Sequence, residues 1–202
     1  MFEFLDDEEN AISILKDDHD KLKELFDEFD KADTHRERTK IVSKVIEILK
    51  LHAAIEEHIF YPAARSCTES FYMDEADEEH HVAKILVAEL GSMKVSADHF
   101  GAKFRVLTEA VRHHIREEEN NIFPEVRDAD MDLVALGKEM LSLRRKLAHQ
   151  GIPKSPEERM VATEKKKSPA NTRRHSGRNA KAPKGAHAHA KKASHIRTGA
   201  PL

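Results

Sequence analysis

Apolar residues in the first 150 positions recur at intervals of three and four, which is the period of an α-helix. Three series show this spacing: Leu15, His19, Leu22, Phe26, Phe29; then Ile41, Val45, Ile48, His52, Ile55, Ile59; then Phe104, Leu107, Val111, His114, Glu118. The pattern predicts helices over residues 10–31, 35–65, 74–95, 99–126 and 131–148.

Signals for helix ends support this division. Thr34 is followed three residues later by Glu37, which is the spacing of a capping box at a helix start. Pro62 and Pro124 lie where a helix should stop, kink or turn, because proline removes a backbone hydrogen bond.

The predicted fold class is all-α. Four of the helices can form an antiparallel bundle, and the fifth, from Asp132 to Ala148, is amphipathic enough to pack outside it as an extra C-terminal helix. Charged residues make up 35% of the chain, with seven Gly and seven Pro among 202 residues, and this suits long solvated helices.

The net charge of −3 conceals a sharp division along the chain. Residues 151–202 carry thirteen Lys and Arg against three Glu, so most of the acidic residues belong to the first 150. Large apolar residues are almost absent after Val161, and such a segment cannot bury enough surface to offset the entropy of ordering it. We therefore expect a folded domain over 1–150 and a disordered basic tail over 151–202.

Several classes of protein are disfavoured by the same composition. No apolar run approaches the eighteen residues of a membrane span, and the acidic N-terminus does not resemble a signal peptide. Cys67 is the one cysteine, which excludes an intrachain disulfide and fits a reducing compartment. A cytoplasmic location is expected. Phosphate-loop, nucleophile-elbow and dinucleotide-binding motifs are missing from the sequence.

The chain contains the same metal-ligand phrase twice. His52 precedes Glu56 by four residues, and His114 precedes Glu118 by four; in each copy a proline follows the glutamate by six. Another histidine stands upstream in an acidic setting, His19 at 33 residues before His52 and His80 at 34 before His114. A separation of four places both side chains on one helical face.

Six residues are therefore candidate metal ligands. They combine imidazoles and carboxylates at positions facing the predicted core, where unpaired polar groups are costly. Bundles hold di-iron and di-manganese centres with such side chains, although zinc is not excluded by sequence. The six are His19, His52, Glu56, His80, His114 and Glu118.

Four neighbours of these ligands have open roles. His81 and His113 lie about 100° around their helices from the adjacent ligand, so they should point at another helix or at solvent. Glu57 and Glu119 recur in both copies, which fits a role beside the ligands or at an entrance, and equally fits a solvated face.

The duplicated phrases resemble the hemerythrin family, in particular its bacterial HHE cation-binding branch, over about residues 10–148. The resemblance implies an up-down-up-down four-helix bundle around a non-haem di-iron centre. It further implies that His19 and His52 bind one iron and His80 and His114 the other. Glu56 and Glu118 would bridge the two irons, together with an oxo or hydroxo ligand.

One position departs from the oxygen-carrying members of the resembled family. Those proteins have a further histidine one turn after the third-helix ligand, and here that position is Lys84. The lysine could bond a bound oxygen species or extend outward to solvent. Its presence favours reaction with O2, peroxide or NO, as a catalase-like or ferroxidase-like enzyme or as a sensor. Reversible O2 binding and iron storage are the alternatives.

The basic tail suggests a separate partner. Its clusters resemble the Ala/Pro/Lys-rich arms of histone-like proteins, which bind phosphate backbones without reading sequence. The clusters include Lys165–Lys167, Arg173–Arg174, Lys181–Lys184 and Lys191–Lys192. Nucleic-acid binding and a solubilising role, or docking on the acidic bundle, all remain open. The oligomeric state is not indicated by the sequence.

Overall fold

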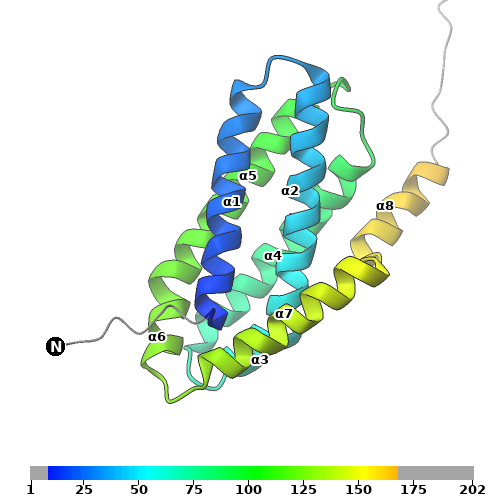
Figure 1. Ribbon diagram of the computed structural model, residues 1–202. Coiled ribbons are helices and arrows are strands. Elements are labelled where there is room, and N and C mark those ends of the chain that lie inside the picture. The colour runs from blue at the N-terminus through cyan, green and yellow to red at the C-terminus, as the bar shows by residue number, and fades with distance from the viewer. Residues whose placement is uncertain (1–8, 168–202) are drawn as a thin grey trace, which may run out of the picture. The chain divides into compact units, whose positions relative to one another are not determined.

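Four helices of the computed structural model, which describes residues 9–167, form an antiparallel bundle (Figure 1). They are α1 (Ala11–Lys31), α2 (His35–Ile55), α4 (Ser70–Gly91) and α5 (Phe100–Glu117). Helix α1 packs on α2 and α5, and α4 packs on the same two helices, which closes the ring. The predicted all-α bundle is confirmed, although α4 begins and ends four residues earlier than the sequence pattern suggested.

Side-chain caps explain where the first two helices begin. The predicted capping box is confirmed, because the Thr34 hydroxyl accepts a hydrogen bond from the Glu37 N–H and the Glu37 carboxylate accepts from the Thr34 N–H. Asn10 and Ser13 make the same reciprocal pair at the start of α1. Both helices therefore begin at defined residues, Ala11 and His35.

The two prolines do not end their helices. A π-helix, η1 (Glu56–Phe60), links α2 to α3 (Tyr61–Ala64), and a second one, η2 (Glu118–Ile122), links α5 to α6 (Phe123–Asp128). Each π-helix closes with a hydrogen bond from the residue before the proline back to the glutamate. The wider turn accommodates Pro62 and Pro124, which lack an N–H, and the chain stays helical beyond them.

Helix α7 (Leu133–Gln150) is the predicted extra helix, and it packs on α1 and α2 instead of joining the bundle. Figure 1 shows it running obliquely across them. Gly137 permits the contact, because a Cβ there would lie 2.9 Å from the backbone nitrogen of Ala11. Met140, a residue of α7, is fully buried.

The chain remains folded beyond the predicted boundary at residue 150. Residues 156–167 form α8 (Pro156–Lys167), which packs on α4, so the expectation of a disordered chain from 151 is wrong for this segment. Ser155 and Glu158 make a capping box across Pro156, a helix-start signal that the low apolar content of the segment concealed. Residues 168–202, with most of the predicted basic tail, lie outside the described part of the chain.

Two apolar clusters fill the bundle, one on each side of a polar layer. One cluster, near the start of α1, contains Ile14, Leu15, Ile55, Phe60 and Phe123, among others. The other, toward the α1–α2 connection, is built around residues such as Leu22, Phe26, Val45, Phe104 and Leu107. The polar layer between them holds the predicted metal ligands. Within residues 9–167, no helix is long and apolar enough to cross a membrane.

Candidate metal centre

The structure brings the six predicted ligands together in the centre of the bundle. His19 comes from α1, His52 from α2, His80 from α4 and His114 from α5, and the two glutamates each open a π-helix. All six are between 0% and 7% exposed. We call them the histidine–glutamate cluster: His19, His52, Glu56, His80, His114 and Glu118.

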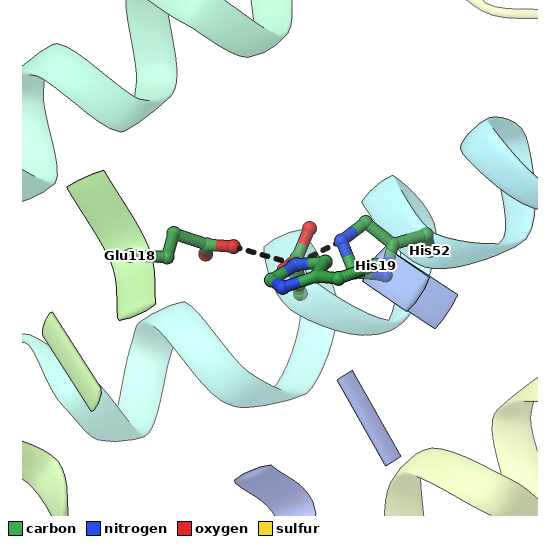
Figure 2. A group of neighbouring side chains, drawn as sticks. His19, His52 and Glu118 are labelled. Carbon is green, nitrogen blue, oxygen red and sulfur yellow. Dashed lines mark ion pairs between the residues drawn. The ribbon is translucent and has the colours of Figure 1, made fainter. Parts of the chain in front are cut away.

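The cluster is organised as two histidine pairs joined by carboxylates. Glu56 lies between the pairs, with its Oε1 3.1 Å from His52 Nε2 and its Oε2 3.3 Å from His80 Nε2. Glu118 Oε2 lies 3.1 Å from His19 Nε2 and 3.5 Å from His114 Nε2. Figure 2 shows His19, His52 and Glu118 pointing toward one another from three different segments.

Every imidazole presents its Nε2 atom to the cluster and its Nδ1 atom to an outer carboxylate. Two of these contacts stay within one copy of the repeated phrase: Asp18 holds His52 at 3.3 Å, and Glu79 holds His114 at 2.8 Å. The other two join different copies: Glu119 holds His19 and Glu57 holds His80, each at 2.9 Å. An Nδ1–H that donates to a carboxylate leaves the Nε2 lone pair directed inward, as metal ligation requires.

Each outer carboxylate is contacted in turn by a basic side chain. Lys23 lies 3.1 Å from Glu119 and Lys84 lies 2.5 Å from Glu57; both lysines follow a cluster histidine by four residues. Arg144 of α7 pairs with Asp18, and His113 lies 3.5 Å from Glu79. The charges of Glu119, Glu57 and Asp18 are thus compensated on the side away from the cluster.

The electrostatics of the metal-free cluster favour a charged imidazole beside a charged carboxylate. Burial alone would lower the pKa of His52, but the charge of Glu56, with the contact to Asp18, raises it to about 10. Burial alone would also lower the pKa of His80, but its contacts with the Glu56 and Glu57 carboxylates raise that pKa to about 9. Burial would raise the pKa of Glu56, yet the neighbouring His52 holds it well below its usual range.

Tyr61 breaks the symmetry between the two copies. Its hydroxyl donates a hydrogen bond to Glu118 Oε1 at 2.9 Å and lies 3.1 Å from His80 Nε2. Burial and the charges of Glu118 and Glu56 raise the pKa of this phenol well above its usual value, so it keeps its proton. The equivalent residue in the second copy is Phe123, which stacks on His19 with ring centroids 5.7 Å apart.

The cluster has the features of a cation site. Five of its inward-facing atoms find no hydrogen-bond partner within the described residues: His19 Nε2, His52 Nε2, both oxygens of Glu56, and Glu118 Oε2. Buried groups in that state are costly unless something neutralises them. Potential ligand atoms gather in two groups that share Glu56, one around His19 and His52 and the other around His80 and His114. These residues therefore fit a pair of metal ions.

Comparison with known proteins identifies the family. Residues 10–126 match the Hemerythrin HHE cation-binding domain. The chain belongs to this family. The family is named for cation binding, and the cluster contains the candidate metal-holding groups of this chain's described residues.

Two individual proteins are similar to this hemerythrin HHE domain. The crystal structure of a Hemerythrin HHE cation binding domain-containing protein from Mycobacterium kansasii is similar in fold, with a TM-score of 0.59 and 24% identity. It covers 70% of this chain and 91% of its own. A protein named DNA nickase from Nostoc sp. is 27% identical over 119 residues, 59% of this chain. Those residues span about a third, 34%, of the nickase.

The structure places the remaining predicted residues in different surroundings. Glu57 and Glu119 contact cluster histidines directly, and Lys84 contacts Glu57 on its outer side. His113 lies against Glu79. His81 points away from the cluster, and its Nδ1 lies 3.2 Å from Glu157 of α8.

Five residues of the site were missed by sequence reasoning: Asp18, Lys23, Tyr61, Glu79 and Arg144. Asp18 and Glu79 had a signal, because an acidic residue directly precedes the upstream histidine in both copies. Tyr61 was visible only as the aromatic residue before a proline. Arg144 had no signal, since nothing in the sequence indicates which face of α7 meets α1.

Proposed function

We propose that this hemerythrin HHE domain holds two iron ions in the histidine–glutamate cluster and that this centre reacts with small oxidants. O2, hydrogen peroxide and NO are the candidate reactants. The proposal rests first on the five orphaned inward-facing atoms and on the outer carboxylate that orients each imidazole. A structural core histidine also takes a hydrogen-bond partner, but it would not direct its second nitrogen, unpartnered, at a layer shared with other imidazoles and carboxylates.

The choice of iron follows from the donor set. Imidazole nitrogen with carboxylate oxygen suits iron and manganese, and zinc also accepts these ligands. The count of two follows from the two histidine pairs, because Glu56 directs one oxygen at each pair. Glu118 also supports a count of two metal ions, since its Oε2 lies within 3.5 Å of a histidine from each pair.

Bound iron would supply the redox chemistry, and the surrounding residues would position and protonate the reactant. Tyr61 is placed to do so, because its hydroxyl lies beside His80 Nε2 and retains its proton. A small molecule beside the second histidine pair could receive the hydrogen bond that Tyr61 otherwise donates to Glu118. The first pair offers no such donor, since Phe123 occupies the equivalent position.

Reaction is favoured over reversible O2 binding. The position where the resembled oxygen carriers have a fifth histidine holds Lys84, and its ammonium group pairs with Glu57 outside the cluster. This protein therefore offers two imidazoles to each metal ion, which leaves more positions open to exchange. Iron storage is the alternative, and it would require more than two irons per chain.

The proposal is tested by metal analysis and an optical spectrum of the purified full-length protein, followed by peroxide consumption. We expect two irons per chain, and we expect Glu56→Ala/Glu118→Ala to lose both the iron and the peroxide consumption. A matched control is Glu47→Ala/Glu109→Ala, which removes two glutamates that lie outside the cluster on α2 and α5. Retention of two irons by the cluster variant would show that the ligands are assigned wrongly.

Exposure of the reduced protein to air distinguishes irreversible reaction with O2 from reversible O2 binding. We expect oxidation that degassing does not reverse. Return of the absorbed O2 on degassing would establish the carrier function instead, and iron far above two per chain would establish storage.

Nucleic-acid binding through the basic C-terminal segment is a second candidate function. It rests on the thirteen Lys and Arg after residue 150 and on the name of the relative called DNA nickase. DNA nicking itself is not proposed, because the match spans about a third of that protein. Binding of duplex DNA that weakens steeply with salt, and is lost from a chain ending at Lys167, would support the candidate. Equal binding by both chains would contradict it.

A further inference from the structure

A cavity of about 330 Å³ lies beside the histidine–glutamate cluster, between α2, α4 and α5. Three cluster histidines, His52, His80 and His114, form one end of it. The volume falls within the usual range for small-molecule sites, about 300–1,000 Å³. It is therefore large enough for a molecule bigger than O2, peroxide or NO.

The walls of the cavity are mostly apolar. Leu49 of α2, Val87 of α4, and Val111 and Ile115 of α5 all contribute, and each is at least nine-tenths buried. Leu22 of α1 completes this side. Apolar cavities of this kind stay dry and accept apolar guests.

The segment after α7 forms the roof of the cavity. Ile152, Pro153 and Pro156 line it from above. An ion pair holds the roof down, because Lys50 lies 3.0 Å from Glu158 Oε1 and bonds its second oxygen as well. The contact of Glu157 with His81 on α4 fixes the same turn.

Charges at the edge of the cavity are already neutralised within the protein. Lys50 pairs with Glu158, and Lys84 pairs with Glu57. Lys154 and His58 also line the cavity, but both are exposed and can keep their polar atoms in water. A charged guest would have to compete with these two pairs or rely on the solvated Lys154, whereas a neutral guest disturbs neither pair.

We propose that this cavity binds one small, neutral, apolar organic molecule against the histidine cluster, with residues 152–158 as its roof. A cavity of about 150 Å³ accepts benzene, so a space of this size admits a fused bicyclic aromatic. The site is distinct from the proposed iron chemistry. Apart from the three histidines at one end, its walls and roof belong to residues outside the cluster, so binding is expected not to require metal.

Indole serves as the probe, titrated into full-length protein by calorimetry and by nuclear magnetic resonance. We expect saturable binding of one indole per chain, with and without metal. Val87→Phe should abolish it by filling the cavity. The matched control is Val106→Phe, which changes an exposed valine of α5 and should bind as the parent does.

A substitution in residues 152–158 provides a second test, in case Val87→Phe prevents the protein from folding. Ile152→Ala leaves the bundle interior unchanged and should weaken indole about tenfold, because it removes apolar contact with the guest. Retained affinity in both Val87→Phe and Ile152→Ala would overturn the proposal, and so would failure of the parent protein to bind indole. Tighter binding of indole-3-carboxylate than of indole would overturn the assignment to neutral guests.

The metal-free variant separates this proposal from the proposed function. Glu56→Ala/Glu118→Ala should lose iron yet still bind indole. Loss of indole binding in that variant, with its helical signal intact, would mean that the guest binds the metal and that the cavity is not an independent site.

Discussion

Each cluster imidazole is held by a carboxylate at its outer nitrogen, and this is the feature that most distinguishes the site from an ordinary polar core. Asp18 and Glu79 each reach the neighbouring helix while the adjacent histidine faces inward, because successive helical residues differ by about 100°. Orienting contacts of this kind fix the tautomer and raise the basicity of a ligand.

Glu79→Gln should lower the apparent metal affinity about 10–100-fold, because an amide is a poorer acceptor than a carboxylate for the Nδ1–H of His114. Competition with a chromophoric chelator measures the change. Glu78→Gln is the control, since Glu78 is the exposed neighbour in the same helix. Equal affinities for the two variants would show that the contact does not orient the ligand.

Metal loading should release protons near neutral pH. His52 and His80 have pKa values raised to about 10 and about 9, so both are protonated in the metal-free protein, yet a metal needs their lone pairs. Apparent affinity should therefore rise with pH until it passes those values, and about two protons should leave on loading. Calorimetry in phosphate and Tris buffers measures the release; buffer-independent heats would contradict it.

At the scale of elements, periodicity and caps were enough to predict the bundle, whereas the π-helices were not predictable. The three-and-four spacing and the Thr34–Glu37 box identify helices because they reflect local geometry. A π-helix leaves the residue types unchanged and widens one turn, so Pro62 and Pro124 indicated a stop, kink or turn without indicating which of these occurs. The offset of six residues from glutamate to proline, present twice, was the visible trace of it.

The docking of α7 was predicted only in outline, and it depends on one glycine. Gly137→Ala should destabilise the fold by about 1–3 kcal/mol, because the added methyl would meet the backbone of Asn10 and Ala11 at 2.9 Å. It should also weaken metal binding, since α7 supplies Arg144 to Asp18. Urea unfolding and metal titration measure both effects.

Gly101→Ala is the matched control for that change. Gly101 lies in α5, and no atom lies within 4 Å of the place that an added methyl would take, so alanine there should be neutral or stabilise by up to about 1 kcal/mol. If both alanine variants change the free energy of unfolding equally, the close approach of α7 at Gly137 is not the cause of destabilisation.

At the scale of the whole molecule, charge and composition indicated two regions but misplaced the boundary. Residues 151–167 have the polar composition of a tail, and their order comes from specific contacts with α2 and α4 that no local pattern reveals. Lys50–Glu158 and His81–Glu157 are the main ones. Composition indicates how much apolar surface a segment can bury. Helix α8 was not predicted because it is stabilised largely by pairs of polar side chains.

A chain ending at Lys167 should keep the helical signal and iron content of the full-length protein, because it retains all the described helices and the six residues of the histidine–glutamate cluster. A chain ending at Gln150 should lose the roof of the cavity and the pairs made by α8, and should unfold at a lower temperature. Circular dichroism and metal analysis compare the three chains. Identical melting of the two shortened chains would mean that α8 adds no stability.

The crossed contacts between the copies make each half of the chain incomplete. Glu119, from the second half, contacts His19 of the first half, and Glu57, from the first half, contacts His80 of the second. The two glutamates inside the cluster also lie close to histidines of both halves. Two polypeptides divided between residues 65 and 69, before α4, should therefore complement one another, each remaining poorly helical until mixed. Iron uptake on mixing would then measure the association of the two pieces. Stoichiometric iron uptake by either piece alone would contradict the prediction. Such mutual dependence means that the centre can mature only after the last bundle helix has been synthesised.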